Sequence, residues 1–132
     1  MKVKNVMIPV DKFPVVLENL FLKEALDLMN EKRLGIACIV DENNILKGIL
    51  TDGDIRRKLL TVQKPLSAIF VDDCIEHAIL TPTVTYPESL LKDAVEQMEK
   101  KQIWDLPVVD ENRKLIGLFH LHPAIKALLN EK

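Results

Sequence analysis

The chain contains an internal repeat. Sliding the sequence by 69 residues places residues 22–60 on residues 91–129 without a gap, and 13 of these 39 positions are then identical. One-third identity without gaps indicates two copies of one supersecondary unit. We therefore expect the 132 residues to fold as two small halves that share a core, a first repeat at residues 1–61 and a linker with the second repeat at residues 62–132.

Each copy shows the same succession of sequence patterns. In the first copy, apolar residues recur at i, i+3, i+4 and i+7 from Leu22, which is typical of an amphipathic helix. Two apolar runs joined by Asp41-Glu42-Asn43-Asn44 then predict a hairpin of two strands, and a short apolar stretch precedes the helix. The predicted elements are at residues 15–17, 22–29, 36–40, 45–50 and 52–60, and again at 84–86, 91–98, 106–109, 115–121 and 123–129.

These patterns predict an α/β fold made of two β-α-β-β-α repeats. A unit of about 50 residues is too small to bury its sheet alone, so we expect the copies to pack sheet to sheet with pseudo-twofold symmetry. Such packing would create one cleft at each strand-to-helix turn. Residues 66–70 and 74–80 are apolar enough to form an ordered linker or a short helix, and residues 3–9 resemble residues 75–82.

The segment Gly48–Arg57 carries the most chemistry. An apolar run ends in Thr51 and the carboxylates of Asp52 and Asp54, and Arg56 and Arg57 then open a helical pattern. A hydroxyl, helix N–H groups and guanidinium groups together suit a phosphorylated ligand, and a carboxylate accepts hydrogen bonds from sugar hydroxyls. The alternative is that Thr51 or Asp52 only caps the helix. The second copy lacks these polar groups, which favours a ligand site in the first copy.

The repeat and its motifs resemble a tandem cystathionine-β-synthase (CBS) domain pair, also called a Bateman module. The resemblance covers almost the whole chain and rests on V-M-x-P at residues 6–9, V-V-D at 108–110 and G-h-h-T-x-x-D at 48–54. More narrowly, Gly48–Arg57 and Gly117–His122 resemble the C-terminal part of sugar-phosphate isomerases of the arabinose-5-phosphate isomerase type. Pairs associated with sugar nucleotidyltransferases share the Thr-Asp-Gly-Asp segment.

This resemblance implies a regulatory module that binds an adenine nucleotide (AMP, ADP or ATP) or a CMP-sugar. By analogy, Thr51 would contact phosphate, Asp54 would hold ribose hydroxyls, and Arg56 or Arg57 would reach the phosphate. The base would lie against Val15, Val16, Ile36 and Ala37. The module would control a sugar-isomerase (SIS) or nucleotidyltransferase domain in cis or in trans. Such pairs commonly form homodimers, and a structural or oligomerisation module that binds no ligand is the alternative.

The second copy departs from the motif, since His120 and Pro123 take the places of Thr51 and Asp54. We therefore predict a degenerate second site with His120, His122 and Trp104 as candidate residues. The two histidines would share one face of a strand, where Asp105 or His77 could complete a metal site, although nothing in the sequence requires a metal. Core packing is the first expectation for Trp104, with the second cleft or a dimer contact as alternatives.

Composition narrows the classes of function. A net charge of −2 and an aromatic content of 5% argue against nucleic-acid binding, and no apolar run approaches the length of a membrane span. Cys38 and Cys74 lack a C-x-x-C spacing, which favours free thiols in a reducing, cytoplasmic setting. Neither a Ser/His/Asp nor a Cys/His arrangement occurs in the sequence. We expect no catalysis by this chain itself, and an isomerase domain would belong to a longer parent protein.

Overall fold

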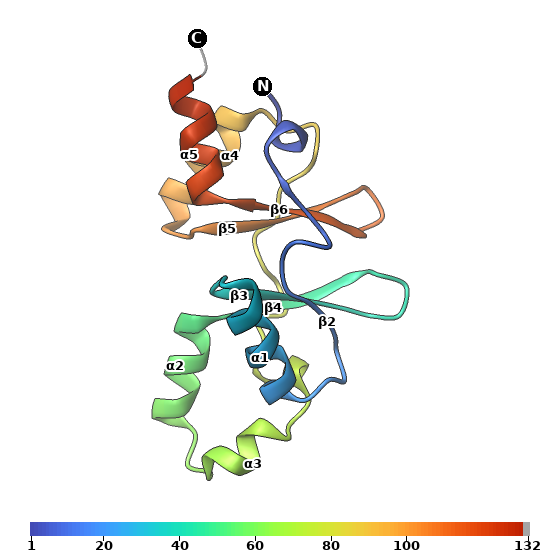
Figure 1. Cartoon of the computed structure of the whole chain (residues 1–132), viewed down its shortest axis with the longest axis vertical. Coiled ribbons are helices and arrows are strands. Elements are labelled where there is room, and N and C mark those ends of the chain that lie inside the picture. Colours follow the sequence, from blue (N-terminus) through green and yellow to red (C-terminus); the bar gives the residue numbers. More distant parts are fainter. Residues whose placement is uncertain (131–132) are drawn as a thin grey trace. The chain divides into compact units, whose positions relative to one another are not determined.

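The computed structural model describes residues 1–130, which form two compact units (Figure 1). The first-repeat unit comprises residues 11–82, and the second-repeat unit comprises residues 1–10 together with the chain from Thr83 onward. This division differs from the division by sequence copies at residues 61 and 62. The N-terminal segment packs with the second copy, and the linker packs with the first.

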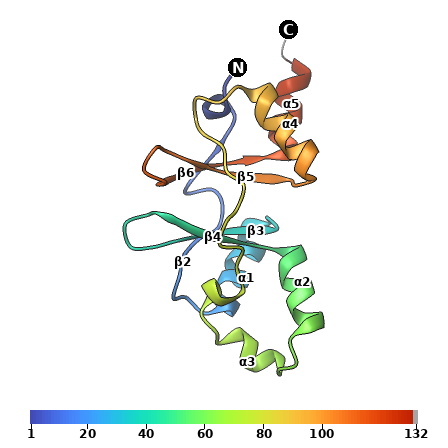
Figure 2. The ribbon, with the colours of Figure 1, turned by 180° about the vertical axis from the view of Figure 1, so that it is seen from behind.

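The first-repeat unit follows the predicted order of elements. Its sheet has the order β2-β3-β4, with β2 parallel to β3 and β3 antiparallel to β4, and both α1 and α2 lie on one face of it (Figures 1 and 2). The core between α1 and the sheet contains Val16, Ala25, Met29, Ala37 and Leu50. The elements are β2 (Val15–Leu17), α1 (Leu22–Lys32), β3 (Ile36–Val40), β4 (Leu46–Thr51), α2 (Asp52–Thr61), α3 (Leu66–Phe70) and the 3-10 turn η2 (Cys74–His77).

The second-repeat unit repeats the α-β-β-α part of this arrangement. Leu91, Ala94 and Met98 of its first helix are buried, as are their counterparts Leu22, Ala25 and Met29, which confirms the helical faces predicted from the sequence. Its sheet has the order β1-β6-β5. The elements are the 3-10 turn η1 (Val3–Asn5), β1 (Ile8–Pro9), α4 (Leu91–Lys101), β5 (Asp105–Val109), β6 (Leu115–His120) and α5 (Leu121–Asn130).

One predicted strand, at residues 84–86, is reduced to a single bridge between Thr85 and Val108. In the first copy, the N–H of Cys38 donates to the carbonyl of Pro14 at 2.9 Å and extends the ladder of β2 with β3. The equivalent position in the second copy is Pro107, which has no N–H to donate. The missing donor therefore shortens the parallel pairing.

The segments that precede the two copies resemble each other in structure, as the sequence indicated. Ile79, which follows η2, bridges Ile49 of β4, and Ile8, which follows η1, pairs with Leu118 of β6. Ile49 and Leu118 are equivalent residues of the repeat. Each unit therefore receives a short antiparallel partner strand from the segment that precedes the other copy.

Helix α5 begins at Leu121, two residues earlier than predicted, and the N–H of Leu121, which has no acceptor within the helix, donates to the carbonyl of Trp104 at 2.9 Å. The equivalent bond in the first copy joins the N–H of Asp52 to the carbonyl of Gly35. Pro123 therefore lies within the first turn of α5, where its missing N–H is tolerated. None of the helices described over residues 1–130 is long and apolar enough to cross a membrane.

Candidate ligand-binding site

Thr51 lies where β4 ends and α2 begins. It has extended backbone angles, and its Oγ1 accepts a hydrogen bond from the N–H of Asp54 at 3.2 Å, so Thr51 is the N-cap of α2. The capping role that the sequence left open is therefore present. The cap also holds the hydroxyl over the first turn of a ten-residue helix, where N–H groups and the helix dipole favour a negative charge.

The Asp54 carboxylate has a partner on each oxygen. The Thr51 hydroxyl donates to Oδ2 at 2.6 Å, and Nη2 of Arg57 donates to Oδ1 at 2.7 Å. The Asp54 side chain is 14% exposed, whereas that of Arg57 is 62% exposed. The three side chains, spaced at i, i+3 and i+6, form a clasp on one face of α2. The structure thus brings together three of the residues predicted for the site.

The apolar residues predicted for the site lie on the two strands beside this turn. Ile36 pairs with Thr51 across β3 and β4, and Val15 pairs with Cys38 across β2 and β3. Val16, Ile36 and Ala37 are buried, and Val15 is half-buried. Val16 and Ala37 belong to the core packed against α1, so their side chains serve folding first.

Asp52 and Arg56 differ from the clasp residues in having no hydrogen bond or ion pair from their side chains among the described residues. Both side chains are exposed. A Cβ on Gly35 would lie 2.6 Å from Oδ2 of Asp52, so the carboxylate uses the space that glycine leaves. Asp52 therefore turns toward the start of β3, whereas Asp54 engages Thr51 and Arg57.

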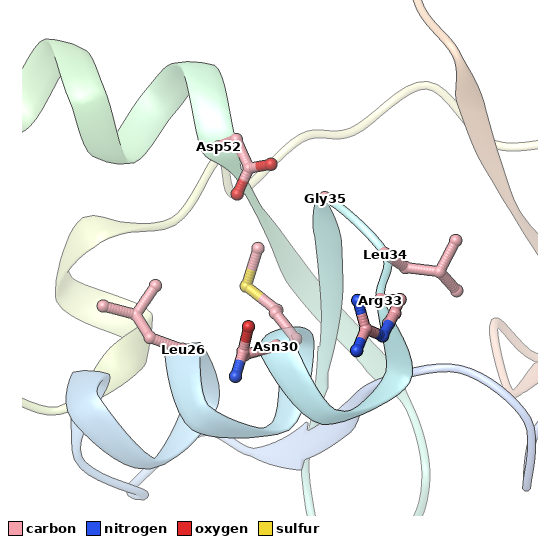
Figure 3. Close-up of a pocket in the computed structure, with 7 residues that line it drawn as sticks. Leu26, Asn30, Arg33, Leu34, Gly35 and Asp52 are labelled. Atoms are coloured by element: carbon pink, nitrogen blue, oxygen red, sulfur yellow. The ribbon is translucent and has the colours of Figure 1, made fainter.

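A pocket of about 340 Å³ adjoins the turn at Asp52 (Figure 3). It lies beside the C-terminal half of α1 and contains neither Thr51 nor Asp54. The sequence did not point to Asn30 and Arg33, which form part of its wall. The one signal in the repeat is that Arg33, which follows α1, has a φ of 58°, and its equivalent Gln102 in the second copy also has positive φ. The lining residues are Leu26, Met29, Asn30, Arg33, Leu34, Gly35 and Asp52.

The turn of the second copy holds a carboxylate–imidazole pair instead of the clasp. Oδ1 of Asp105, the first residue of β5, lies 2.6 Å from Nδ1 of His120, the last residue of β6. Burial raises the pKa of Asp105, and the hydrogen bond and the electrostatic interaction with His120 oppose this rise. The prediction that His120 and His122 share one strand face is wrong, because His122 lies in α5.

Trp104 is 70% exposed, so the expectation that it packs in the core is wrong. Its position is equivalent to Gly35, next to the start of β5. It lines an apolar pocket of about 420 Å³ whose other walls are formed by α4 and α5. The lining residues are Val95, Met98, Glu99, Gln102, Ile103, Trp104, Leu121 and Ile125, and most of them are the repeat equivalents of the pocket beside Asp52.

His77 belongs to the first-repeat unit, whereas His120 and His122 belong to the second-repeat unit. Nε2 of His77 lies 2.9 Å from Oδ2 of Asp72. Nζ of Lys64 also donates to both oxygens of Asp72. The hydrogen bonds with Lys64, and to a smaller extent the one with His77, lower the pKa of Asp72. Glu76 brings a third potential ligand atom within 4.8 Å. Because the ammonium group of Lys64 already neutralises Asp72, this cluster is explained as a contact that holds Lys64 against the start of η2.

The fold and this site define a class of protein, a two-repeat α/β module with a capped strand-to-helix turn that carries hydroxyl, carboxylate and guanidinium groups. The chain belongs to the CBS domain family, whose sequence profile matches residues 3–61 and 76–129. The resemblance stated from the motifs alone is confirmed.

Relatives and solved structures agree with this assignment. An uncharacterised protein of Helicobacter pylori strain J99 is 38% identical over 95% of this chain, and the arabinose 5-phosphate isomerase KdsD of Francisella tularensis is 31% identical over 96%. The chain spans 36% and 37% of their lengths, respectively. The crystal structure of CBSX2 in complex with AMP aligns with this chain at a TM-score of 0.85 and 27% sequence identity, and the alignment covers 98% of this chain and 96% of that one.

Proposed function

We propose that the first repeat binds a nucleotide at the turn between β4 and α2 and that binding regulates a catalytic partner. The observation that carries the proposal is the clasp of Thr51, Asp54 and Arg57 at the N-terminus of α2. It places a helix N-terminus, which favours a phosphate, beside a carboxylate that can accept hydrogen bonds from sugar hydroxyls. CBSX2, a relative with a similar fold, has been crystallised with AMP, which supports an adenine nucleotide as the first ligand to test.

The apolar side of the site is formed mainly by backbone and by Val15. Val16, Ile36 and Ala37 are buried, so a base would meet the backbone of β2 and of the start of β3 rather than freely exposed side chains. Such a surface favours a flat ring without selecting strongly among bases. AMP, ADP, ATP and a CMP-sugar are therefore all suitable probes.

Isothermal titration calorimetry of the whole chain with these four ligands tests the proposal. We expect one ligand to bind with 1:1 stoichiometry, and we expect Asp54→Ala to weaken it by at least about tenfold, because a lost charged hydrogen bond is worth roughly 1.5–3 kcal/mol. Asp73→Ala removes an equal charge outside the site and is the matched control. Absence of heat from all four ligands at millimolar concentration would refute the proposal.

The regulated partner that we propose is a sugar-phosphate isomerase or a nucleotidyltransferase domain, in the same polypeptide or in another. The 31% identity to an arabinose 5-phosphate isomerase supports the first of these. A ligand can shift such a partner only if it binds the two conformational states of the assembly with different affinities. The test is to assay the parent isomerase with and without the ligand found by calorimetry.

A second candidate function is oligomerisation without a ligand. The observation that favours it is a set of apolar side chains on the second-repeat unit, with Trp104, Ile125 and Leu129 exposed at 70%, 41% and 79%. Exposed apolar groups of this kind are often covered by a partner. Light scattering would decide, since a stable homodimer of the free chain combined with null titrations would favour this candidate over ligand binding.

A further inference from the structure

Arg57 makes a contact that its proposed role in phosphate binding does not explain. Its Nη2 donates to Oδ1 of Asp54 at 2.7 Å, while the Thr51 hydroxyl donates to Oδ2 of the same carboxylate. A carboxylate offers about four lone-pair sites, so each oxygen keeps roughly one site for a further donor. Two adjacent free acceptor sites match the two hydroxyls of a vicinal diol.

The two partners also determine the orientation of the carboxylate. Rotation about the bond to a carboxylate is broad when nothing restrains it. Thr51 lies three residues before Asp54 and Arg57 three residues after it, so the two donors hold opposite oxygens from the same face of α2. Loss of either donor would remove one of the two restraints on rotation of the Asp54 carboxylate.

Gly53 provides a second observation. A Cβ on Gly53 would lie 3.2 Å from Nη2 and 3.3 Å from Nη1 of Arg57, so the guanidinium lies back over the first turn of the helix. The glycine leaves the space that this side chain occupies beside Asp54. The sequence Thr51-Asp52-Gly53-Asp54 thus accommodates Arg57 as well as the cap.

Pairing with Asp54 also changes what Arg57 can offer to a phosphate. The negative charge of Asp54 offsets the positive charge of Arg57, so the pair attracts an anion less than a free guanidinium does. Arg56, the residue that precedes Arg57, is exposed and has no hydrogen bond or ion pair from its side chain among the described residues. Arg56 therefore remains the stronger candidate for the phosphate.

We propose that Arg57 is a positioning residue that orients Asp54 toward a vicinal diol and so makes the site selective for ribose over deoxyribose. This inference rests on the proposed nucleotide site. It assigns the phosphate contact to Arg56 and the helix N-terminus, and it gives the two adjacent arginines different functions.

The test is calorimetry with AMP and with 2′-deoxy-AMP on wild type, Arg57→Ala, Arg57→Lys and Arg56→Ala. For Arg57→Ala we expect AMP binding to weaken by about tenfold and 2′-deoxy-AMP binding by about twofold or less, so that the preference for ribose falls. Arg57→Lys should restore part of the preference, since an ammonium group can still donate to Asp54. Arg56→Ala should weaken both ligands equally. Equal losses for both ligands in Arg57→Ala would overturn the inference.

A measurement without ligand separates this inference from the proposed function. Rotation of the Arg57 guanidinium, followed by NMR of its side-chain nitrogens in the free protein, should be slower than that of Arg56 and should accelerate in Asp54→Asn. Free rotation of Arg57 in wild type would overturn the clasp. Absence of binding by AMP, ADP, ATP and the CMP-sugar together with hindered rotation would instead refute the proposed nucleotide function.

Discussion

The backbone of Ile79 lies so close to Gly48 that a Cβ on Gly48 would be 2.7 Å from the carbonyl oxygen of Ile79. The N–H of Ile49 donates to the same oxygen at 3.0 Å, and the N–H of Ile79 donates to the carbonyl of Ile49 at 2.9 Å. The glycine is therefore needed because the segment after η2 crosses β4 at hydrogen-bonding distance. The equivalent Gly117 lies under Met7 and Ile8 in the other unit.

Alanine at these two glycines should have unequal effects on the free energy of unfolding. Gly48→Ala should destabilise the chain by roughly 1–3 kcal/mol, because the neighbouring atom is backbone and must move. Gly117→Ala should cost less, because its closest neighbour is the flexible end of Met7, with Sδ 2.7 Å away. Urea denaturation of both variants is the measurement, and an equal or larger loss in Gly117→Ala would contradict this account.

The repeat made much of the fold predictable. Periodicity within each copy predicted the buried faces of α1 and α4, and the strand at residues 36–40 has the predicted bounds. These features depend on apolar spacing, which is local. The strand predicted at residues 84–86 is reduced to a single bridge, because its pairing depends on one N–H that Pro107 lacks, a detail that an apolar pattern does not register.

The site was predictable in its residue types and less so in its pairings. The spacing of Asp54 and Arg57 allows a helical ion pair, but the same arginine could equally be assigned to a phosphate, and the sequence does not decide between them. The pair of Asp105 with His120 depends on the register of β5 and β6. The exposure of Trp104 depends on the way α4 and α5 leave their sheet. Each of these features is tertiary.

A second prediction concerns the hairpin turns. Asn44 and Arg113 are equivalent residues in the two hairpins and both have positive φ, 65° and 63°. Asparagine tolerates this conformation better than arginine does, and glycine adopts it without strain. Arg113→Gly should therefore stabilise the chain by roughly 0.5–1 kcal/mol, and Asn44→Gly should have a smaller effect.

Thermal denaturation of Arg113→Gly and Asn44→Gly checks this prediction. Lys114→Gly serves as the control, because Lys114 is adjacent to Arg113 but does not have a positive φ. That control should be neutral or destabilising. Destabilisation by Arg113→Gly would show that the turn is not strained.

A third prediction concerns acid and the N-terminal segment. Hydrogen bonds from Lys2 and Lys4 lower the pKa of Glu88 from 4.5 to about 2. Since the pKa is lower in the folded state, this contribution to stability is complete above about pH 4.5 and is lost as the pH falls toward 2. The difference in melting temperature between wild type and Glu88→Gln should therefore shrink over this range.

The size of this effect should be small and sensitive to salt, because the side chains of Lys2, Lys4 and Glu88 are 45%, 46% and 62% exposed. Melting curves at about pH 6 and about pH 3, each at low and high ionic strength, give the comparison. Asp41 and Asp72 also have lowered pKa values, so wild type and Glu88→Gln should both lose stability in acid. A difference between them that does not change with pH would contradict the assignment to Glu88.

The fourth prediction is that Cys74 does not react in the folded protein. Burial raises the pKa of its thiol to about 11, and its Sγ lies 3.3 Å from the carbonyl oxygen of Leu17, to which it donates. At about pH 8 the thiolate is then roughly a hundredfold scarcer than for a thiol of unperturbed pKa, and the reagent must also reach a side chain in the core. Cys38 is buried as well. A thiol reagent should therefore label neither cysteine under native conditions and both in denaturant, whereas rapid native labelling of Cys74 would show that η2 opens away from the sheet.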